Sequence, residues 1–460
     1  MLRKVVILGL IWMLCSCGVI YQSVQGGLTS INSSQMLRQG RYGALSEQEL
    51  EWAKIAWQYV ENNTQATTGL VNAIDRYPTA NMSALADYLI SLEAARTFEL
   101  ISNKQYDERL SLAISFLVEM PLGRVGTPNK VYSTTSGDMV DYGNQPKEIG
   151  WSSVDVGRLL IVLAIIKQKS PEFSEYIDKA VLRWNFCELV SEEGELFGGT
   201  VHVNDIQRYK EGRLGIEEYT SYGYLDWNIV PAKAMRLDPY EVITINGVDI
   251  LFDGRDPRQF HIQNPVYSTP YLWLGLEFNW DNIQDNSSSD ASHSNAVLSA
   301  MADSIYQVQE NRWHQERIYT ARADHVVSGE PYSVYDAIYA LGTPWVTITE
   351  NGTSYDELAL VSTRAAFQMW ALWKTPYTDR LMTLVKELYD ADRGWYEGRY
   401  EISSSYEKSI TLKTNAGVLE ALLYKVNGKL YQSQSEVGFR DVQFNSRFHH
   451  PGKCHIKTFR

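Results

Sequence analysis

The stretch that says most about the fold is residues 152–168, which read SSVDVGRLLIVLAIIKQ. Between Val154 and Ile166 it is almost entirely apolar, and Asp155 and Arg158 interrupt it one helical turn apart. Its length predicts a helix rather than a strand. Similar stretches recur along the chain, so this helix is expected to be one of a series.

The amphipathic stretches number about twelve. The first begins at Ser46, a good N-cap that Glu47 and Glu49 follow. The others lie near 82–101, 104–119, 152–168, 171–186, 213–235, 268–278, 291–313, 331–341, 354–373, 376–389 and 414–426. Long segments with aromatic residues and short strand-like pieces separate them at 120–149, 189–209, 238–267 and 391–413. Loops of this length are usually functional, and we expect them to crowd one end of a helical array.

An even number of helices near twelve, without alternation of strands and helices, predicts an all-α fold. The expected form is an (α/α)6 toroid, as an incomplete or decorated barrel, with long loops and short β pieces at one end. A helical domain with a small β-rich insert around 238–267 is the alternative that the boundary signals leave open. The folded body is expected over residues 41–430, and a locally basic C-terminal tail follows over 431–460.

The N-terminus has the pattern of a bacterial lipoprotein signal. Two basic residues precede an apolar run from Val5 to Leu14 that is too short to span a bilayer, and the segment ends at Cys17. The pattern predicts a signal peptide over 1–16, a lipid on Cys17 and a Ser-, Gln- and Gly-rich tether over 17–40. It therefore predicts an extracytoplasmic protein that a lipid anchors to a bacterial membrane. Glycine rather than aspartate after the cysteine favours the periplasmic face of an outer membrane.

Composition disfavours several kinds of partner. The formal net charge is −13 over 460 residues, and removing the two basic residues of the signal peptide makes it −15. Such acidity disfavours nucleic acid and anionic membrane surfaces. No second apolar segment of about 18 residues occurs, so the body is not expected to span a membrane. Cys187 and Cys454 remain after Cys15 is removed and Cys17 is lipidated, either as one disulfide or as two free thiols.

Several strings carry a resemblance to a known family. They are Thr68-Gly69-Leu70-Val71, Gly150-Trp151-Ser152-Ser153-Val154-Asp155-Val156-Gly157-Arg158-Leu159-Leu160, Glu217-Glu218-Tyr219 with Gly223-Tyr224, Ser362-Thr363-Arg364-Ala365-Ala366-Phe367, Gly394-Trp395-Tyr396-Glu397-Gly398, and Thr414-Asn415-Ala416 with Leu419-Glu420-Ala421. In order and spacing they resemble a bacterial glucoamylase-like family, the domain of unknown function 3131. This family is related to the glucoamylase-like modules of cyclic β-1,2-glucan synthases and to endo-β-1,2-glucanases. The likeness extends over nearly the whole body, from about 46 to 430.

The resemblance implies an (α/α)6 barrel with an acidic, aromatic-lined cleft that binds a glycan and can hydrolyse it. Members of the family often carry a Trp-Asp pair early in the second helix, where this chain has Ser83-Ala84. Asp87 follows one turn later. If the missing acid takes part in catalysis, the resemblance implies a glycan binder that has lost its chemistry.

Glycosidic cleavage needs one protonated carboxyl group, to assist the leaving oxygen, and one ionised carboxylate, to activate water or attack carbon. Acids that lie among aromatics are candidates, because desolvation raises the pKa of a carboxyl group. Glu218 is the first candidate for the catalytic acid, and Glu217 lies beside it. Tyr222 and Asp226 fall one and two turns from Glu218 on the same helix face, and with the adjacent Trp227 they are candidates for substrate binding. An exposed acidic stripe is the alternative for the two glutamates.

Asp155 and Glu277 are the further catalytic candidates. Asp155 interrupts an apolar helix, so it either meets substrate or forms a structural ion pair with Arg158. Glu277 is a lone acid at the end of an aromatic stretch that contains Trp273. Arg158 and Trp273 are therefore candidates for substrate binding.

Trp395 and Glu397 end a loop-like segment that is expected to project them toward a sugar. Aromatic faces stack on pyranose rings, and carboxylates hydrogen-bond the hydroxyl groups. The 13 Trp and 29 Tyr residues exceed what a core needs, although a single aromatic is more often core than platform. The acids before Gly394 lack the remaining ligands of a calcium loop. No phosphate loop, zinc helix motif, paired-cysteine motif or serine elbow occurs, so neither a metal nor a cofactor is expected.

Two functions follow from these patterns. The first is a glycan-active lipoprotein, a glycoside hydrolase that uses two carboxyl groups on an extracytoplasmic polysaccharide, with a β-glucan favoured. The second is a non-catalytic polysaccharide-binding lipoprotein in a glycan synthesis or export assembly, whose proteins would be its partners.

Overall fold

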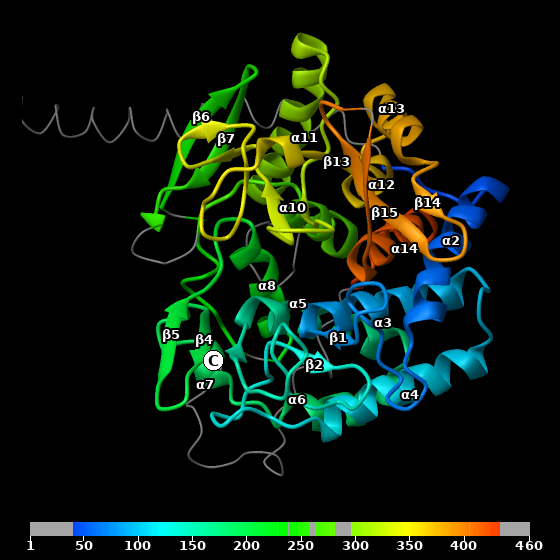
Figure 1. Cartoon of the computed structure of the whole chain (residues 1–460), viewed down its shortest axis with the longest axis vertical. Helices are drawn as coiled ribbons and strands as arrows, with labels where there is room; N and C mark the ends of the chain where they lie inside the picture. Colours follow the sequence, from blue (N-terminus) through cyan, green and yellow to red (C-terminus); the bar gives the residue numbers. More distant parts are fainter. Residues whose placement is uncertain are drawn as a thin grey trace, which may run out of the picture.

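Six helices contact one another in a closed ring (Figure 1). The computed structural model describes residues 40–432 apart from 228, 238, 258–262, 281–295 and 404. The ring consists of α3 (Met82–Thr97), α5 (Ser153–Lys169), α8 (Ile216–Leu225), α10 (Thr269–Trp273), α12 (Thr363–Leu372) and α14 (Leu412–Asn427). Each helix contacts the next, and α14 closes the ring against α3.

Further helices cover the ring from outside. They are α2 (Glu47–Asn63) on α14, α4 (Asn103–Glu119) on α3, α6 (Ser174–Val181) on α5, α11 (Ala296–Glu316) on α10, and α13 (Pro376–Val385) on α12. The shorter helical segments are α7 (Phe186–Leu189), 3-10 turns at Pro171–Phe173 and Asp356–Leu358, and a π-helical turn at Leu274–Phe278 that continues α10. Two such layers of helices are compatible with the predicted helical barrel.

The described residues also form six small antiparallel sheets. The sheets are β1 (Thr79–Ala80) with β2 (Tyr132–Ser133); β3 (Gly150–Trp151), β4 (Phe197–Val201) and β5 (Ile206–Lys210); β6 (Tyr240–Ile245) with β7 (Val248–Asp253); β8 (Asp324–Val326), β9 (Ser333–Asp336) and β12 (Thr347–Ile348); β10 (Tyr339–Ala340) with β11 (Thr343–Pro344); and β13 (Leu360–Ser362), β14 (Tyr389–Asp390), β15 (Gly394–Tyr400) and β16 (Tyr406–Ile410). The fold class all-α is therefore only partly correct. The β6–β7 hairpin lies within 238–267, where the alternative prediction placed a small β-rich insert.

Helix boundaries follow the caps in the sequence. Ser46 and Glu49 form a capping box at the start of α2, with the Ser46 N–H donating to Glu49 Oε2 at 2.7 Å. The helix predicted over 331–341 was wrong, because this segment forms β9 and β10. In β9, buried Val334 and Asp336 alternate with more exposed neighbours, which is the two-residue period of a strand. The helix predicted over 213–235 ends earlier, at Leu225.

Two glycines bring α5 and α8 close together. A Cβ atom on Gly223 would lie 2.2 Å from the Gly157 carbonyl oxygen, and one on Gly157 would lie 2.7 Å from Thr220 Cβ. Only residues without a side chain allow the two backbones to approach this closely. The contact fixes α5, whose first turn carries Asp155.

Several sequence predictions fall outside the described residues. These are the signal peptide, the lipidated Cys17 with the tether up to residue 39, and the tail from residue 433. Cys187 is disulfide-bonded, but Cys454 is not among the described residues, so their pairing stays a prediction. Within the described part of the chain, no helix combines the length and the apolar character that crossing a membrane requires.

Candidate active site

Asp155 lies in the first turn of α5, beside the start of α3. Ser152 caps α5, with its Oγ accepting from the Asp155 N–H at 3.0 Å. Asn81 caps α3, with its Oδ1 accepting from the Ala84 N–H at 2.7 Å. The Asn81 amide also donates to Asp155 Oδ2 at 3.1 Å. The two caps therefore place Asp155 at the end of the ring where α3 and α5 begin.

The starts of three more ring helices meet at Asp324. Its carboxylate accepts from Thr269 Oγ1 of α10 at 2.8 Å, forms an ion pair with Arg364 of α12 at 3.0 Å, and contacts Lys413 of α14. These two cations outweigh burial and lower the pKa of Asp324 below its usual range. The positive charge of Lys413 also acts on Asp155, and each of the two residues lies in the first turn of its ring helix.

A cavity of about 210 Å³ opens at this end, and we call it the acid pocket. Its lining includes three acids, one arginine and two tyrosines: Asp155, Glu211, Glu350, Arg213, Tyr267 and Tyr335. The two tyrosine rings lie 5.6 Å apart in an edge-to-face arrangement. An acidic pocket with aromatic walls suits a ligand that has both hydroxyl groups and apolar ring faces.

Glu211 lies in the loop that follows β5, and its carboxylate contacts the first turn of α5. Its Oε2 accepts from the Ser153 N–H at 2.5 Å, the Ser153 hydroxyl at 2.8 Å and the Val154 N–H at 3.3 Å. Free N–H groups at a helix N-terminus suit an anionic partner. The fold therefore holds an oriented carboxylate next to Asp155.

Asp155 has the protonation behaviour of a general acid. Its side chain is partly open to the pocket, but the surrounding loops enclose its carboxyl group. This burial raises the pKa of Asp155 to about 7, the charge of Glu211 adds to the increase, and Lys413 and Lys130 oppose it. A carboxyl group with this pKa carries a proton in a large fraction of molecules near neutral pH.

More tyrosines surround the three acids of the pocket. Tyr142 is 72% exposed, yet the charges of Asp155, Glu350 and Glu211 act on its hydroxyl group. Tyr209 accepts a hydrogen bond from Lys130 Nζ at 2.9 Å, and burial, together with the same acids, raises the pKa of Tyr209. An exposed tyrosine close enough to feel the charge of these acids is suited to stack on a sugar.

Arg158 lies in a buried charge network rather than in an ion pair with Asp155. Its guanidinium contacts Asp87 at 2.6 Å, Glu277 at 3.0 Å and the Tyr219 hydroxyl at 2.6 Å. The guanidinium also lies 3.7 Å from the centre of the Trp273 ring. Of the two alternatives that the sequence left open for Asp155, the ion pair with Arg158 is wrong, because Arg158 pairs with Asp87 and Glu277.

The buried network gives Glu277 and Trp273 structural contacts. Glu277 is 0% exposed, and its second oxygen accepts from the Tyr219 hydroxyl at 2.8 Å. Burial raises the pKa of Glu277, and burial together with the charge of Glu277 raises the pKa of the neighbouring Glu420 well above its ordinary value. Neither Glu277 nor Trp273 lines the acid pocket.

Glu217 and Glu218 are buried, so the exposed stripe that the sequence left open does not exist. Glu217 pairs with Arg255 at 2.5 Å. Glu218 Oε2 accepts from the Gly215 N–H at 2.6 Å, and no hydrogen-bond partner lies beside Oε1 within the described part of the chain. Burial, with the charge of Glu217, raises the pKa of Glu218 well above its ordinary value. The pocket lining includes Ile216 but neither glutamate, so catalysis by either glutamate stays a prediction.

Tyr222, Asp226 and Trp227 lie in the second half of α8 and just beyond it, where all three are buried. Tyr222 packs edge-to-face on Phe278 at 5.1 Å, and Asp226 accepts from the Tyr431 hydroxyl at 2.7 Å. The structure does not bring these residues to the acid pocket. Their predicted contact with substrate has no support from this geometry.

Trp395 and Glu397 lie on β15, not on a projecting loop. Trp395 is fully buried, and its indole N–H donates to the Trp52 carbonyl oxygen at 3.2 Å. Glu397 Oε1 accepts from Thr411 and Thr414, and burial raises the pKa of Glu397. The expected projection toward sugar was therefore wrong, because both side chains pack between β15 and the helices.

Glu211, Glu350 and Asn81 are not among the site residues that the sequence predicted. Asn81 had a detectable signal, because an asparagine directly before an apolar helix is a typical N-cap. Glu211 and Glu350 lie in polar loops without periodicity, so only the folded chain brings them to Asp155. Among the described residues, no group of three or more His, Cys, Asp and Glu side chains is arranged to hold a metal ion.

The described part of the chain is thus a helical barrel with an acidic, aromatic-walled pocket at one end of its ring. The chain belongs to the family described as Protein of unknown function (DUF3131), whose sequence profile matches residues 51–428. It has no significant match among curated proteins.

Solved structures share the fold at low sequence identity. A glucoamylase-like protein from Bacteroides uniformis is 11% identical, with 89% of this chain and 96% of that chain covered and a TM-score of 0.59. The endo-β-1,2-glucanase from Chitinophaga pinensis, in complex with sophorotriose and glucose, is 13% identical, with 84% and 94% covered and a TM-score of 0.57. A mutant of the endo-β-1,2-glucanase from Talaromyces funiculosus, in complex with β-1,2-glucan, is 11% identical, with 87% of each chain covered and a TM-score of 0.55.

Proposed function

We propose that the protein is a glycoside hydrolase that cleaves a β-glucan outside the cytoplasm, with Asp155 and Glu211 as its two carboxyl groups. The observation that carries this proposal is that both line one pocket at the same turn of α5. Their environments differ as the reaction requires. Asp155 is enclosed and has a pKa of about 7, and Glu211 accepts hydrogen bonds at a helix N-terminus.

In the proposed reaction, Asp155 gives its proton to the glycosidic oxygen as the bond from this oxygen to the anomeric carbon breaks. The bonding electrons leave with the oxygen, which becomes a hydroxyl group of the released chain. Glu211 takes a proton from water as the water attacks the anomeric carbon, or attacks that carbon itself before water does. The configuration of the first product distinguishes inversion from retention.

Three residues around the acid pocket have supporting roles in this proposal. Asn81 holds the Asp155 carboxyl through its donated hydrogen bond. Tyr142 offers an exposed ring for stacking against a sugar. Lys413 limits the increase in the pKa of Asp155, because its charge favours the ionised form.

A linear β-1,2-glucan is the first substrate to test. Proteins of the same fold were solved in complex with sophorotriose and with β-1,2-glucan, which motivates this choice. The acids of the acid pocket also disfavour a polyanionic chain. The proposal includes the lipid anchor predicted at Cys17, which would keep the enzyme beside a polysaccharide that passes through the cell envelope.

The test is a reducing-end assay of the full chain against linear β-1,2-, β-1,3-, β-1,4- and α-glucans, with binding followed in parallel. New reducing ends from one polymer, and their loss in the Glu211→Gln variant, are the expected result. Asp107→Asn and Glu172→Gln are matched controls, because they remove exposed carboxylates elsewhere. Binding without cleavage by the unmodified protein would instead support a non-catalytic role in a synthesis or export assembly.

A further inference from the structure

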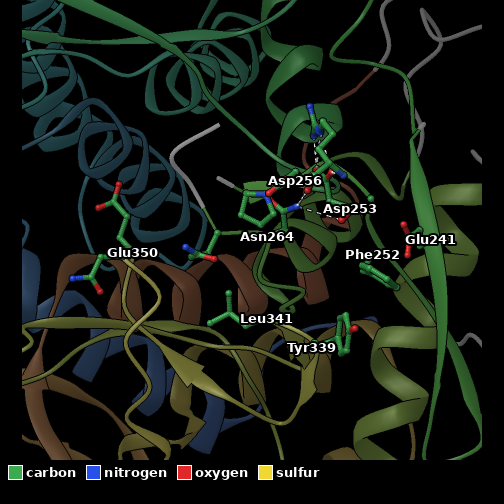
Figure 2. A pocket seen from close by; sticks show the side chains of 15 residues that line it. Glu241, Phe252, Asp253, Asp256, Asn264, Tyr339, Leu341 and Glu350 are labelled. Atoms are coloured by element: carbon green, nitrogen blue, oxygen red, sulfur yellow. Dashed lines mark hydrogen bonds and ion pairs between the residues drawn. The ribbon is translucent and has the colours of Figure 1, made fainter. Parts of the chain in front are cut away.

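A second and larger cavity lies beside the acid pocket, and we call it the side cavity. Its volume is about 650 Å³, whereas that of the acid pocket is about 210 Å³. Gln263 and Glu350 line both cavities, so the two are contiguous. Figure 2 shows Glu350 at the opposite side of the side cavity from Phe252 and Glu241. Glu350 therefore marks the border between the two cavities.

Apolar side chains from two hairpins form walls of the side cavity. Phe252 of β7 and Tyr339 of β10 have ring centres 4.7 Å apart at an angle of 57° (Figure 2). Leu341 is 50% exposed in the turn that joins β10 to β11. The turn holds Leu341 at φ 53° and Gly342 at φ 78°. Two rings and an exposed leucine offer the apolar contact that the faces of pyranose rings seek.

The polar floor of the side cavity is held in place by ion pairs. Arg255 contacts Asp253 and Glu217, each at 2.5 Å. Asn264 donates to the carbonyl oxygens of Arg255 at 2.7 Å and Asp253 at 3.2 Å. Glu217, which the sequence placed in catalysis, thus stabilises the floor of the side cavity.

The charges around the side cavity favour an uncharged ligand over an anionic one. Glu241 and Glu350 are exposed on its lining. Asp253 and Glu217 compensate the charge of Arg255. A chain that bears carboxylate or phosphate groups would meet repulsion here, whereas hydroxyl groups can donate hydrogen bonds to the free carboxylates.

We propose that the side cavity binds further sugar units of the same uncharged polysaccharide, so that the chain lies across both cavities during cleavage. This inference rests on the proposed hydrolase function. The acid pocket alone is smaller than a typical ligand site of about 300–1,000 Å³, and the side cavity falls within that range. The side cavity would therefore make the protein prefer long chains to short oligosaccharides.

The test compares polymer and trisaccharide of the same linkage as substrates of the full chain. Phe252→Ala, Tyr339→Ala and Leu341→Asn each remove apolar contact from the side cavity. Asparagine tolerates the positive φ at position 341, so the last variant keeps the turn. We expect the ratio of kcat/KM for polymer to kcat/KM for trisaccharide to fall about fivefold to tenfold. Tyr176→Ala is the matched control, because Tyr176 is a 59% exposed tyrosine on α6 outside both cavities.

An unchanged ratio in the folded Leu341→Asn variant, or an equal loss on both substrates, would overturn the side-cavity inference and leave the hydrolase proposal intact. Failure of the unmodified protein to cleave any glucan would overturn both. Thermal unfolding of each variant identifies any loss that comes from misfolding of Phe252→Ala or Tyr339→Ala.

Discussion

At the scale of single residues, Asp155 combines an ordinary side chain with an unusual environment. It follows a serine N-cap and receives a hydrogen bond from Asn81, and the charges of Glu211 and Lys413 act on its pKa in opposite directions. The sequence indicated Asp155 because an acid inside an apolar helix is rare. It did not indicate Glu211, because loop residues lack a periodic pattern and only the folded chain brings this residue to Asp155.

The first prediction concerns the pH dependence of catalysis. Because Asp155 must be protonated to act as the acid, kcat is expected to fall as pH rises through about 7, the pKa of that carboxyl. Lys413 favours the ionised form of Asp155. Lys413→Met should therefore move the pH at which kcat falls to a higher value, as a pH profile of kcat would show.

Lys386→Met is the control for that profile, because Lys386 is an exposed lysine beyond the end of α13. Its profile should coincide with that of the unmodified protein. If kcat of Lys413→Met falls at the same pH as that of the unmodified protein, the assignment of this pH dependence to Asp155 is contradicted.

The second prediction concerns Arg158, which compensates two buried carboxylates. Arg158→Met leaves Asp87 and Glu277 without their cation inside the ring, where their exposed fractions are 3% and 0%. Loss of one partner from a buried ion pair costs about 3–5 kcal/mol of unfolding free energy. Urea denaturation measures this loss.

Arg208→Met is the matched control for the Arg158 variant. Arg208 pairs with Glu188, but its side chain is 54% exposed, so the expected loss is below about 1 kcal/mol. Equal losses in the two variants would show that the buried network contributes no more than a surface pair.

At the scale of elements, periodic segments were predictable and alternating segments were less so. The helices expected at 82–101, 152–168 and 414–426 are α3, α5 and α14, because a long apolar stripe leaves few alternatives. The segment 331–341 folds as strands, because short runs of aromatic and β-branched residues fit a strand as well as a helix. The acid pocket needs both kinds of element, so its full lining was not predictable from the sequence.

The third prediction tests the close contact between α5 and α8. Gly223→Ala would place a methyl group 2.2 Å from the Gly157 carbonyl oxygen, and neither backbone can yield without moving its helix. The overpacking is expected to cost about 1–3 kcal/mol of unfolding free energy, although alanine favours a helix. Differential scanning calorimetry would record it as a lower Tm.

Gly329→Ala is the control for the helix contact, because no atom lies within 4 Å of the added methyl group. Its Tm should stay close to that of the unmodified protein. A Gly223→Ala variant with an unchanged Tm would mean that the ring is less tightly packed at this contact.

At the scale of the whole molecule, buried carboxyl groups couple stability to pH. The pKa values of Asp155, Glu218 and Glu420 are raised in the folded state, mainly by burial. Between the ordinary carboxyl pKa and these raised values, the folded chain binds more protons than the unfolded chain. The unfolding free energy must therefore fall as pH increases through that window.

The fourth prediction follows from this sign. For Asp155 the window extends from its ordinary value of 3.8 to about 7, so urea midpoints are expected to be higher at pH 5 than at pH 7.5. Asp155→Asn should reduce the difference, because it removes one of the titrating groups. Asp324, whose pKa is lowered, has the opposite sign, and its contribution is lost only in stronger acid. A midpoint that rises from pH 5 to pH 7.5 would contradict the burial of these carboxyl groups.

The measurement that tests the central claim most directly compares the unmodified full chain with Asp155→Asn on linear β-1,2-glucan. Release of reducing ends and binding of the polymer are measured on the same preparations. We predict that the substitution lowers kcat by at least about a hundredfold, while the dissociation constant for the polymer changes little. Equal cleavage by both proteins would contradict the role of Asp155 as the catalytic acid, and binding without cleavage by both would contradict the hydrolase function itself.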